Sequence, residues 1–182
     1  MEIISSKTLF KVYNKILFLW HKNEKKIKTL DQAIKLLSLW KNSFLEMVND
    51  LIIVNCYLWH EEDKARASSF SSSKIAKVKH NIDYANQCRV NKVENIDKHI
   101  VNCINNVKDK TTKKTPLNSE TPGSIIDRLS VLSLKIYHMN EQIKRKDASK
   151  DHKGKCKNKL NTLFEQKKDL SGCFDKFIRD LL

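Results

Sequence analysis

The stretch Leu129-Ser-Val-Leu-Ser-Leu-Lys-Ile-Tyr-His-Met139 is apolar on almost every face of a helix, which is typical of a helix inside a bundle. It follows the pair Thr121-Pro122. This pair favours a helix start, because proline at the first helical position gives up no hydrogen bond. We therefore predict that a helix begins after Thr121 and that its middle is the most buried element of the protein.

On both sides of this stretch, apolar residues recur three and four positions apart, the spacing of one helix face. The other predicted helices begin at Ser5 or Ser6, after Thr29, at about 43 (ending near 67, separate from the second or continuous with it), at about 74 (ending near 108), and after Asp147 or Ser149. Residues 109–121 are polar and predict a linker. The triplet Leu-Trp-His occurs at 19–21 and again at 58–60, but nothing around it repeats.

The composition supports an all-α fold. Among 182 residues there are only three glycines and two prolines, too few for the many turns of a β-rich protein. The same scarcity excludes phosphate-binding glycine loops, dinucleotide fingerprints and nucleophile elbows. We predict that residues 1–182 form a single helical bundle of five to six helices, mostly antiparallel.

The net charge of +14 invites comparison with nucleic-acid-binding proteins. The basic side chains are 30 Lys and only 5 Arg, whereas base readers and phosphate clamps favour the forked guanidinium of Arg. The Lys are also spread over nearly all predicted helices. We therefore expect a solvated basic surface and no nucleic-acid partner.

The cysteines and the apolar runs predict where the protein resides. Five cysteines, an odd number without a C-x-x-C pair, are typical of reduced thiols in a cytoplasm. The apolar run at 16–20 is too short for a signal-peptide core. Glu46 and Asp50 interrupt the run at 44–59, so no membrane span is expected. We expect a cytoplasmic protein without a membrane partner.

The informative residues are charged side chains at positions where the helical pattern calls for apolar ones. Arg89 lies in the middle of an apolar face, at the same angle as Ile82. An unpaired buried charge costs several kcal/mol, about the whole stability of a small domain. Such groups must therefore meet one another or a ligand, and we expect Arg89 to pair with Asp63 or Asp127.

Two functional interpretations fit the polar residues of these helices. Acids and basic residues on facing helices describe a pocket for a small phosphorylated anion, or for a metal and a phosphate together. The same residues also describe a closed salt-bridge network in a structural or adaptor protein. The candidate ligand-binding residues are Glu62, Asp63, Arg66, Asp83, Asn86, Arg89, Glu94, Asp97, Asp127, Arg128, Lys135 and His138.

A third interpretation is a Mg²⁺-dependent enzyme. The motif Glu94-Asn-Ile-Asp97 resembles half of the metal-binding pattern of all-α nucleoside triphosphate pyrophosphohydrolases. Those enzymes also need an upstream E-x-x-E, and this chain has only His60-Glu-Glu-Asp63, which departs from the pattern. His60 and His138 are expected to be hydrogen-bonded residues of the core or its rim rather than metal ligands.

Several blocks of the chain resemble a known family. They include Trp59-His-Glu-Glu-Asp-Lys-Ala-Arg66, Leu117-Asn-Ser-Glu-Thr-Pro122 and, as the most specific block, the D-R-L-S sequence at 127–130. From about residue 59 to 182 the chain resembles an uncharacterised bacterial family, domain of unknown function number 4254. The resemblance implies an all-α cytoplasmic protein and supplies no catalytic residue. The family's R-x-D motif reads Arg89-Val-Asn91 here. If the acid of that motif binds a metal, metal binding by this chain would be impaired.

Overall fold

The structure, a computed structural model, describes residues 4–41, 43–105 and 117–181. In these ranges it contains helices and loops and no strand, which confirms the all-α class. The elements are α1 (Ser6–Asn23), the 3-10 turn η1 (Glu24–Lys26), α2 (Leu30–Leu37), α3 (Phe44–Ala65), α4 (Ser72–Asn105), α5 (Pro122–Lys144) and α6 (Lys150–Leu181).

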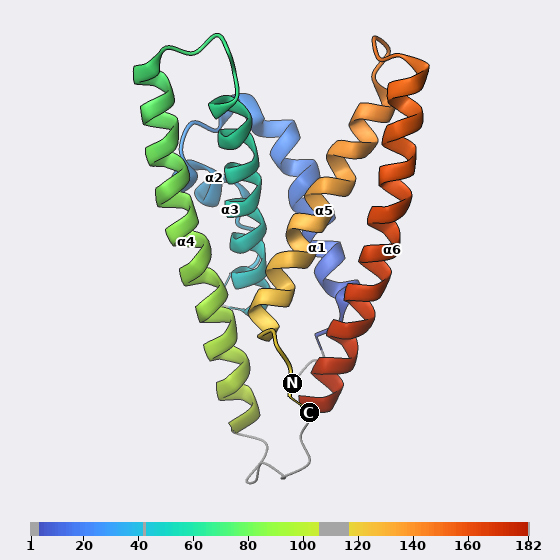
Figure 1. The fold of residues 1–182 in the computed structure, drawn as a ribbon. Helices are drawn as coiled ribbons and strands as arrows, with labels where there is room; N and C mark the ends of the chain where they lie inside the picture. The colour runs from blue at the N-terminus through green and yellow to red at the C-terminus, as the bar shows by residue number, and fades with distance from the viewer. Residues whose placement is uncertain (1–3, 42, 106–116, 182) are drawn as a thin grey trace.

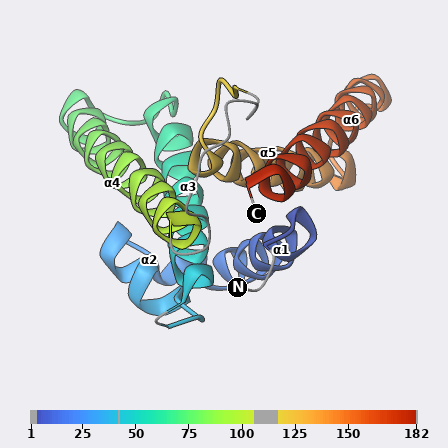
Figure 2. The ribbon, with the colours of Figure 1, turned by 90° about the horizontal axis from the view of Figure 1, so that it is seen from below.

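Two antiparallel hairpins make up most of the molecule. Helices α3 and α4 form one hairpin and α5 and α6 form the other, and the two diverge toward one end so that the molecule has the outline of a V (Figure 1). The hairpins contact each other through α3 and α5 and through α4 and α5. Helix α1 packs against α3, α5 and α6, while α2 covers another side of α3 (Figure 2). No described helix is long and apolar enough to cross a membrane.

Local hydrogen bonds fix where the helices begin. An N-cap side chain satisfies one of the backbone N–H groups that the first turn of a helix leaves without a partner. The observed caps are Ser5 to the N–H of Thr8, Thr29 to that of Gln32, Thr121 to that of Ser124, and Ser149 to that of His152. Thr29 and Thr121 were predicted as helix starts, and Ser5 and Ser149 are each one of the two residues predicted for theirs. Pro122 is at the first position of α5 as expected.

The prediction that α5 is the most buried element is wrong. Helix α3 is buried without a break from Val48 to Leu58, whereas residues 136–140 of α5 are half-buried. The physical reason is that α3 contacts α1, α2, α4 and α5 and so has a neighbour on every side. Of the predicted linker, residues 109–116 lie outside the described residues, and 117–121 form the irregular approach to α5.

Candidate functional site

Arg89 and Asp127 form an ion pair between α4 and α5, as the sequence predicted for one of two acids. The guanidinium donates from Nε and Nη2 to the two carboxylate oxygens of Asp127, at 3.0 Å from Nε to Oδ1 and 2.5 Å from Nη2 to Oδ2. The Asp127 side chain is 9% exposed and that of Arg89 35% exposed. The hydrogen bonds to Asp127 raise the pKa of Arg89, so its guanidinium remains charged.

A polar side chain of α3 completes this arrangement. The amide of Asn55 donates to Asp127 Oδ1 at 2.8 Å and to the Ser130 hydroxyl oxygen at 2.6 Å, and that hydroxyl donates to the Asp127 carbonyl. Asp127 therefore has donors from α3 and α4 around its carboxylate. We call Asn55, Arg89, Asp127 and Ser130 the Asp127 network. Both oxygens of the carboxylate accept hydrogen bonds from the protein, which is the arrangement expected of a closed structural network.

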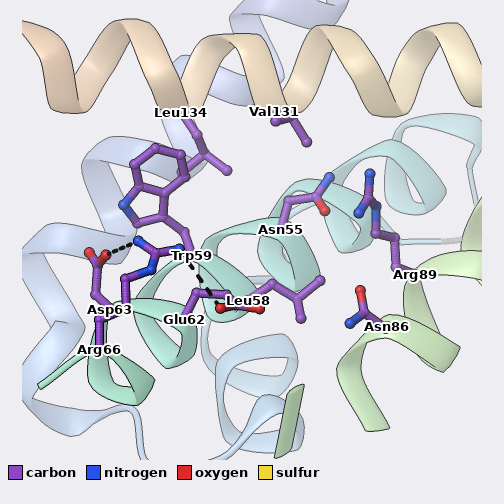
Figure 3. Close-up of a pocket in the computed structure, with 10 residues that line it drawn as sticks. All are labelled: Asn55, Leu58, Trp59, Glu62, Asp63, Arg66, Asn86, Arg89, Val131 and Leu134. Carbon is purple, nitrogen blue, oxygen red and sulfur yellow. Dashed lines mark hydrogen bonds and ion pairs between the residues drawn. The ribbon is translucent and has the colours of Figure 1, made fainter. Parts of the chain in front are cut away.

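Three adjoining cavities form a cleft along α5. A cavity of about 220 Å³ lies between α3, α4 and α5 (Figure 3). A second, of about 470 Å³, shares Arg89 and Val131 with it and extends between α5 and α6. A third, of about 500 Å³, shares Lys135 and Gln166 with the second and Trp59 with the first. We call the third one the α6 cavity; it is lined by Trp59, Asp63, Lys135, His138, Met139, Gln142, Lys159, Thr162, Leu163 and Gln166.

Eight of the twelve predicted ligand-binding residues line this cleft. They are Glu62, Asp63, Arg66, Asn86, Arg89, Arg128, Lys135 and His138. Most of the cationic groups among them already have acidic partners. Arg66 lies 3.2 Å from Asp63 and 3.8 Å from Glu62 (Figure 3). Arg128 lies 2.5 Å from Glu120, whose pKa is lowered by the Ser124 hydroxyl and by Arg128.

The other four predicted residues lie elsewhere. Asp97 accepts the backbone N–H of Gly123 at 2.6 Å and so holds the first turn of α5 against α4. Glu94 is exposed and lies 3.5 Å from Lys98, and Asp83 is exposed on α4. Asp127 is in its network, beneath the cleft. The acids considered for Mg²⁺ are thus dispersed: the one group of three or more potential metal ligands among the described residues consists of histidines.

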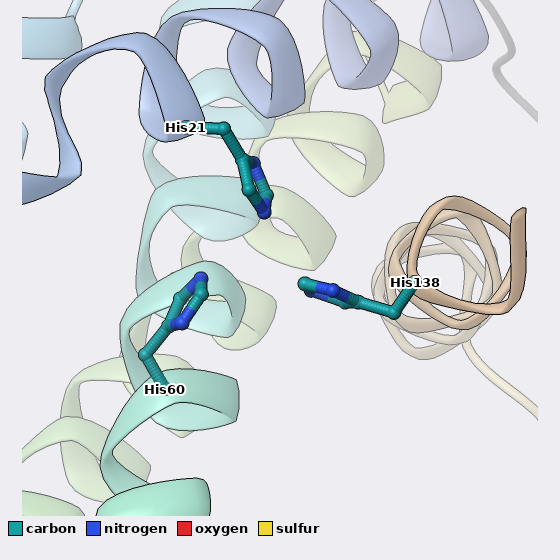
Figure 4. Close-up of side chains that lie close together, drawn as sticks. All are labelled: His21, His60 and His138. Atoms are coloured by element: carbon teal, nitrogen blue, oxygen red, sulfur yellow. The ribbon is translucent and has the colours of Figure 1, made fainter. Parts of the chain in front are cut away.

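Those histidines come from three helices and meet near the wide end of the V. His21 extends from α1, His60 from α3 and His138 from α5, and their rings point toward a common centre (Figure 4). One ring nitrogen of each lies within 4.8 Å of those of the other two. Tryptophans support two of the rings, with Trp59 stacked on His138 at 4.8 Å and Trp20 on His60 at 5.4 Å between centroids. We call these three histidines the histidine cluster.

The histidine cluster contains buried nitrogens without hydrogen bonds. The Nε2 atoms of all three rings are buried and have no partner among the described residues. A buried polar atom left in this state costs about 1–3 kcal/mol. Burial lowers the pKa of His60 and of His138, with carboxylates acting in the opposite direction on each. Both rings are therefore neutral near pH 7, the form that binds metals.

Sequence reasoning missed this cluster. It treated His60 and His138 as residues of the core or rim and did not consider His21. One signal was present, because the two Leu-Trp-His triplets supply two of the histidines and both stacking tryptophans. Because His138 lies far from both triplets along the chain, the sequence did not indicate that it would join them.

Comparison with known proteins identifies the family of the chain. The model of the family described as "Protein of unknown function (DUF4254)" matches residues 45–182, more than half of the sequence. The chain belongs to this family. The DUF4254 match covers α3 to α6, and so includes the cleft, the Asp127 network, His60 and His138, whereas His21 lies in α1, before it. No curated protein and no solved structure matched the chain.

Proposed function

We propose that the protein binds a small phosphorylated anion in the α6 cavity. The observation that carries this proposal is a pair of ammonium groups, those of Lys135 and Lys159, that line the cavity. Neither has an acidic partner among the residues that the structure describes. An incoming phosphate would therefore form charge-assisted hydrogen bonds without displacing an existing ion pair.

The remaining lining of the cavity supports a ligand with an apolar or ring portion. Trp59, Met139 and Leu163 provide apolar surface, while Thr162 and Gln166 provide hydrogen-bonding groups. Ligand pockets of this volume combine a mostly apolar lining with a few polar groups that orient the ligand. The combination is suited to a nucleotide or a sugar phosphate.

The second cavity of the cleft contributes positive electrostatic potential to ligand binding rather than direct contacts with the anion. Arg89 and Arg128 line the second cavity, but their guanidinium groups are already paired with Asp127 and Glu120. Breaking such a pair to bind a phosphate would leave an acid behind. The contacts to the anion are therefore assigned to Lys135 and Lys159.

A thermal-shift screen of nucleotides, nucleotide sugars and sugar phosphates, with and without Mg²⁺, tests the proposal. A ligand at about 100 times its dissociation constant stabilises the fold by about 2.7 kcal/mol, which raises the melting midpoint by roughly 5–10 °C. Lys135→Met and Lys159→Met should reduce this shift. Lys168→Met, at an exposed lysine of α6 outside the cavity, should not. A screen in which no compound moves the midpoint, or in which all three variants respond alike, would reject the proposal.

The closed Asp127 network favours a second candidate function, that of a scaffold or adaptor protein. In this alternative the buried ions only fix how α3, α4 and α5 pack. It is supported if the screen finds no ligand and if substitutions in the Asp127 network change stability alone. The two candidates are separated by the lysine variants, which should leave a scaffold unaffected.

A further inference from the structure

We infer that His21, His60 and His138 form a binding site for one divalent transition-metal ion, with Zn²⁺ the best match. This inference does not rest on the anion site proposed above, although His138 also lines the α6 cavity. It rests on where the ring nitrogens point, on what holds the rings in place, and on the chemistry of three imidazoles facing one another.

The outer nitrogens of the rings fix which inner nitrogen carries a lone pair. Nδ1 of His21 lies 2.9 Å from the carbonyl oxygen of Leu17, which can only accept a hydrogen bond, so Nδ1 carries the proton. Nδ1 of His138 lies 2.8 Å from a carboxylate oxygen of Glu141, and the same argument applies.

The third ring follows the same pattern more loosely. Nδ1 of His60 lies 3.5 Å from a carboxylate oxygen of Glu24. In His21 and His138 these hydrogen bonds place a proton on Nδ1, so in the neutral form Nε2 carries the lone pair, and the carboxylate beside Nδ1 of His60 favours the same form of that ring. Each Nε2 is buried without a partner in the described part of the chain, and one nitrogen of each ring lies within 4.8 Å of those of the other two.

A cation satisfies this arrangement better than a water molecule does. A water has two hydrogens and can donate to two of the three Nε2 acceptors, so one would remain unsatisfied. A metal ion accepts all three lone pairs at once. In tetrahedral zinc sites the Zn–N bonds are about 2.0–2.1 Å, which places the nitrogens about 3.3 Å apart. The ring nitrogens here lie within 4.8 Å of one another, so small ring movements would close the site.

The partners of the outer nitrogens match those of known metal ligands. A histidine that binds a metal almost always donates its other N–H to a carboxylate or a backbone carbonyl, which fixes the ring and makes it more basic. Here the Leu17 carbonyl and the Glu141 carboxylate accept from His21 and His138, and the Glu24 carboxylate lies 3.5 Å from Nδ1 of His60. They come from α1, η1 and α5, so the outer partners do not depend on a single helix.

The rings are also held in orientation before any ion binds. The Trp59 indole stacks on His138 with an angle of 6° between the planes, and Trp20 stacks on His60 with an angle of 9°. Tyr137 lies against His21 at 4.3 Å between centroids. A preorganised set of ligands loses less conformational freedom on binding, which favours affinity.

The donor set indicates the class of metal. Neutral imidazoles suit Zn²⁺ and the neighbouring transition metals, whereas Mg²⁺ requires oxygen ligands and octahedral geometry. No further His, Cys, Asp or Glu of the described residues joins the group. Three protein ligands leave a fourth tetrahedral position for water or an anion, as in catalytic zinc sites.

The test is a titration of the chelator-treated full chain with Zn²⁺ and Co²⁺, using Mg²⁺ as the negative control. Calorimetry should give one Zn²⁺ per chain and no heat with Mg²⁺. Co²⁺ should develop the strong visible absorption of a tetrahedral complex in place of the weak bands of the hydrated ion. His60→Gln and His138→Gln should each weaken Zn²⁺ binding by more than the 10–100-fold typical of a lost outer partner. Glu141→Gln should fall within that range.

Two controls separate this site from other metal-binding groups. His80→Gln changes an exposed histidine of α4 outside the cluster and should bind Zn²⁺ like wild type. The double variant Cys103→Ser/Cys156→Ser removes two thiols that lie beside His99 and His152, and should also retain the site. If a glutamine variant does not fold, His138→Phe takes its place, because phenylalanine removes the ring nitrogens but keeps a ring that can stack on Trp59.

Three results would overturn the inference. They are the absence of stoichiometric Zn²⁺ binding, equal binding by wild type and the cluster variants, and loss of binding in the cysteine double variant. Because the anion screen can be run on chelated protein, failure of the anion proposal would leave this result unaffected, and the reverse also holds.

Discussion

The Asp127 network and the histidine cluster both place polar side chains in the interior, and both use residues of α3 and α5. In the network, the Asp127 carboxylate accepts from Arg89 and Asn55. In the cluster, each ring has a partner at Nδ1 while its buried Nε2 has none among the described residues. We expect a closed set of this kind to serve architecture, and we propose a ligand for the open one, because a buried polar atom without a partner lowers stability.

The largest change in stability is expected from substitutions that break the Asp127 network. Arg89→Met leaves the buried carboxylate of Asp127 without its counter-ion and should lower the free energy of unfolding by about 3–5 kcal/mol. Asp127→Asn should cost less, because the half-exposed Arg89 side chain can turn to solvent. Urea denaturation measures both. Arg66→Met removes a 71%-exposed arginine and should change stability by less than about 0.5 kcal/mol. Equal losses for Arg89→Met and Arg66→Met would contradict the assignment of the network to architecture.

A smaller loss of stability is expected from a substitution in the first turn of α5, next to the Asp127 network. A Cβ added at Gly123 would lie 2.6 Å from the carbonyl oxygen of Val93 and 2.8 Å from a carboxylate oxygen of Asp97. Gly123→Ala should therefore cost about 1–3 kcal/mol through overpacking. Gly172→Ala is the matched control, because a Cβ there meets nothing within 4 Å and alanine is the better helix former. It should stabilise the protein slightly, and thermal melting of the pair should show opposite signs.

The histidine cluster is expected to make the stability of the protein depend on pH. Burial lowers the pKa of His60 and His138 in the folded protein, so the unfolded chain takes up protons first as the pH falls. Stability of the metal-free protein should be complete above about pH 6.5, the ordinary histidine pKa, and should decline as the pH falls below it. Denaturation at pH 7.5, 6.5 and 5.5 tests this. The double variant His60→Phe/His138→Phe should lose less stability over that range, and an unchanged slope would count against the buried neutral rings.

The smallest effect, weak binding of nucleic acid, is expected at the basic surface, which is part of neither the Asp127 network nor the histidine cluster. With a net charge of +14 the protein should bind nucleic acid weakly and without sequence preference, with a dissociation constant of roughly 10⁻⁶–10⁻⁴ M at physiological salt. Affinity should fall steeply between low and physiological salt as condensed counterions are released. Fluorescence anisotropy with unrelated duplexes measures both. A sequence-selective complex stable at about 0.2 M salt would show that the surface carries specificity after all.

The sequence by itself determined the helices and where they begin. Thr29 and Thr121 cap their helices as predicted, and Ser5 and Ser149 are each one of the two caps predicted there, because a cap depends on hydrogen bonds within one turn of the chain. The position of Arg89 on an apolar face also predicted that it would pair with an acid. The choice of Asp127 over Asp63 was not predictable, because it depends on which side of α4 faces α5.

Only the tertiary structure decided what the buried polar groups meet. Helix α3 became the most buried element because four helices surround it, and a helix's own pattern does not state how many neighbours it has. His21, His60 and His138 each stand at an ordinary position of its own helix. Their convergence depends on how α1, α3 and α5 pack, since contacts between residues distant in sequence are set by the packing of whole helices rather than by local spacing.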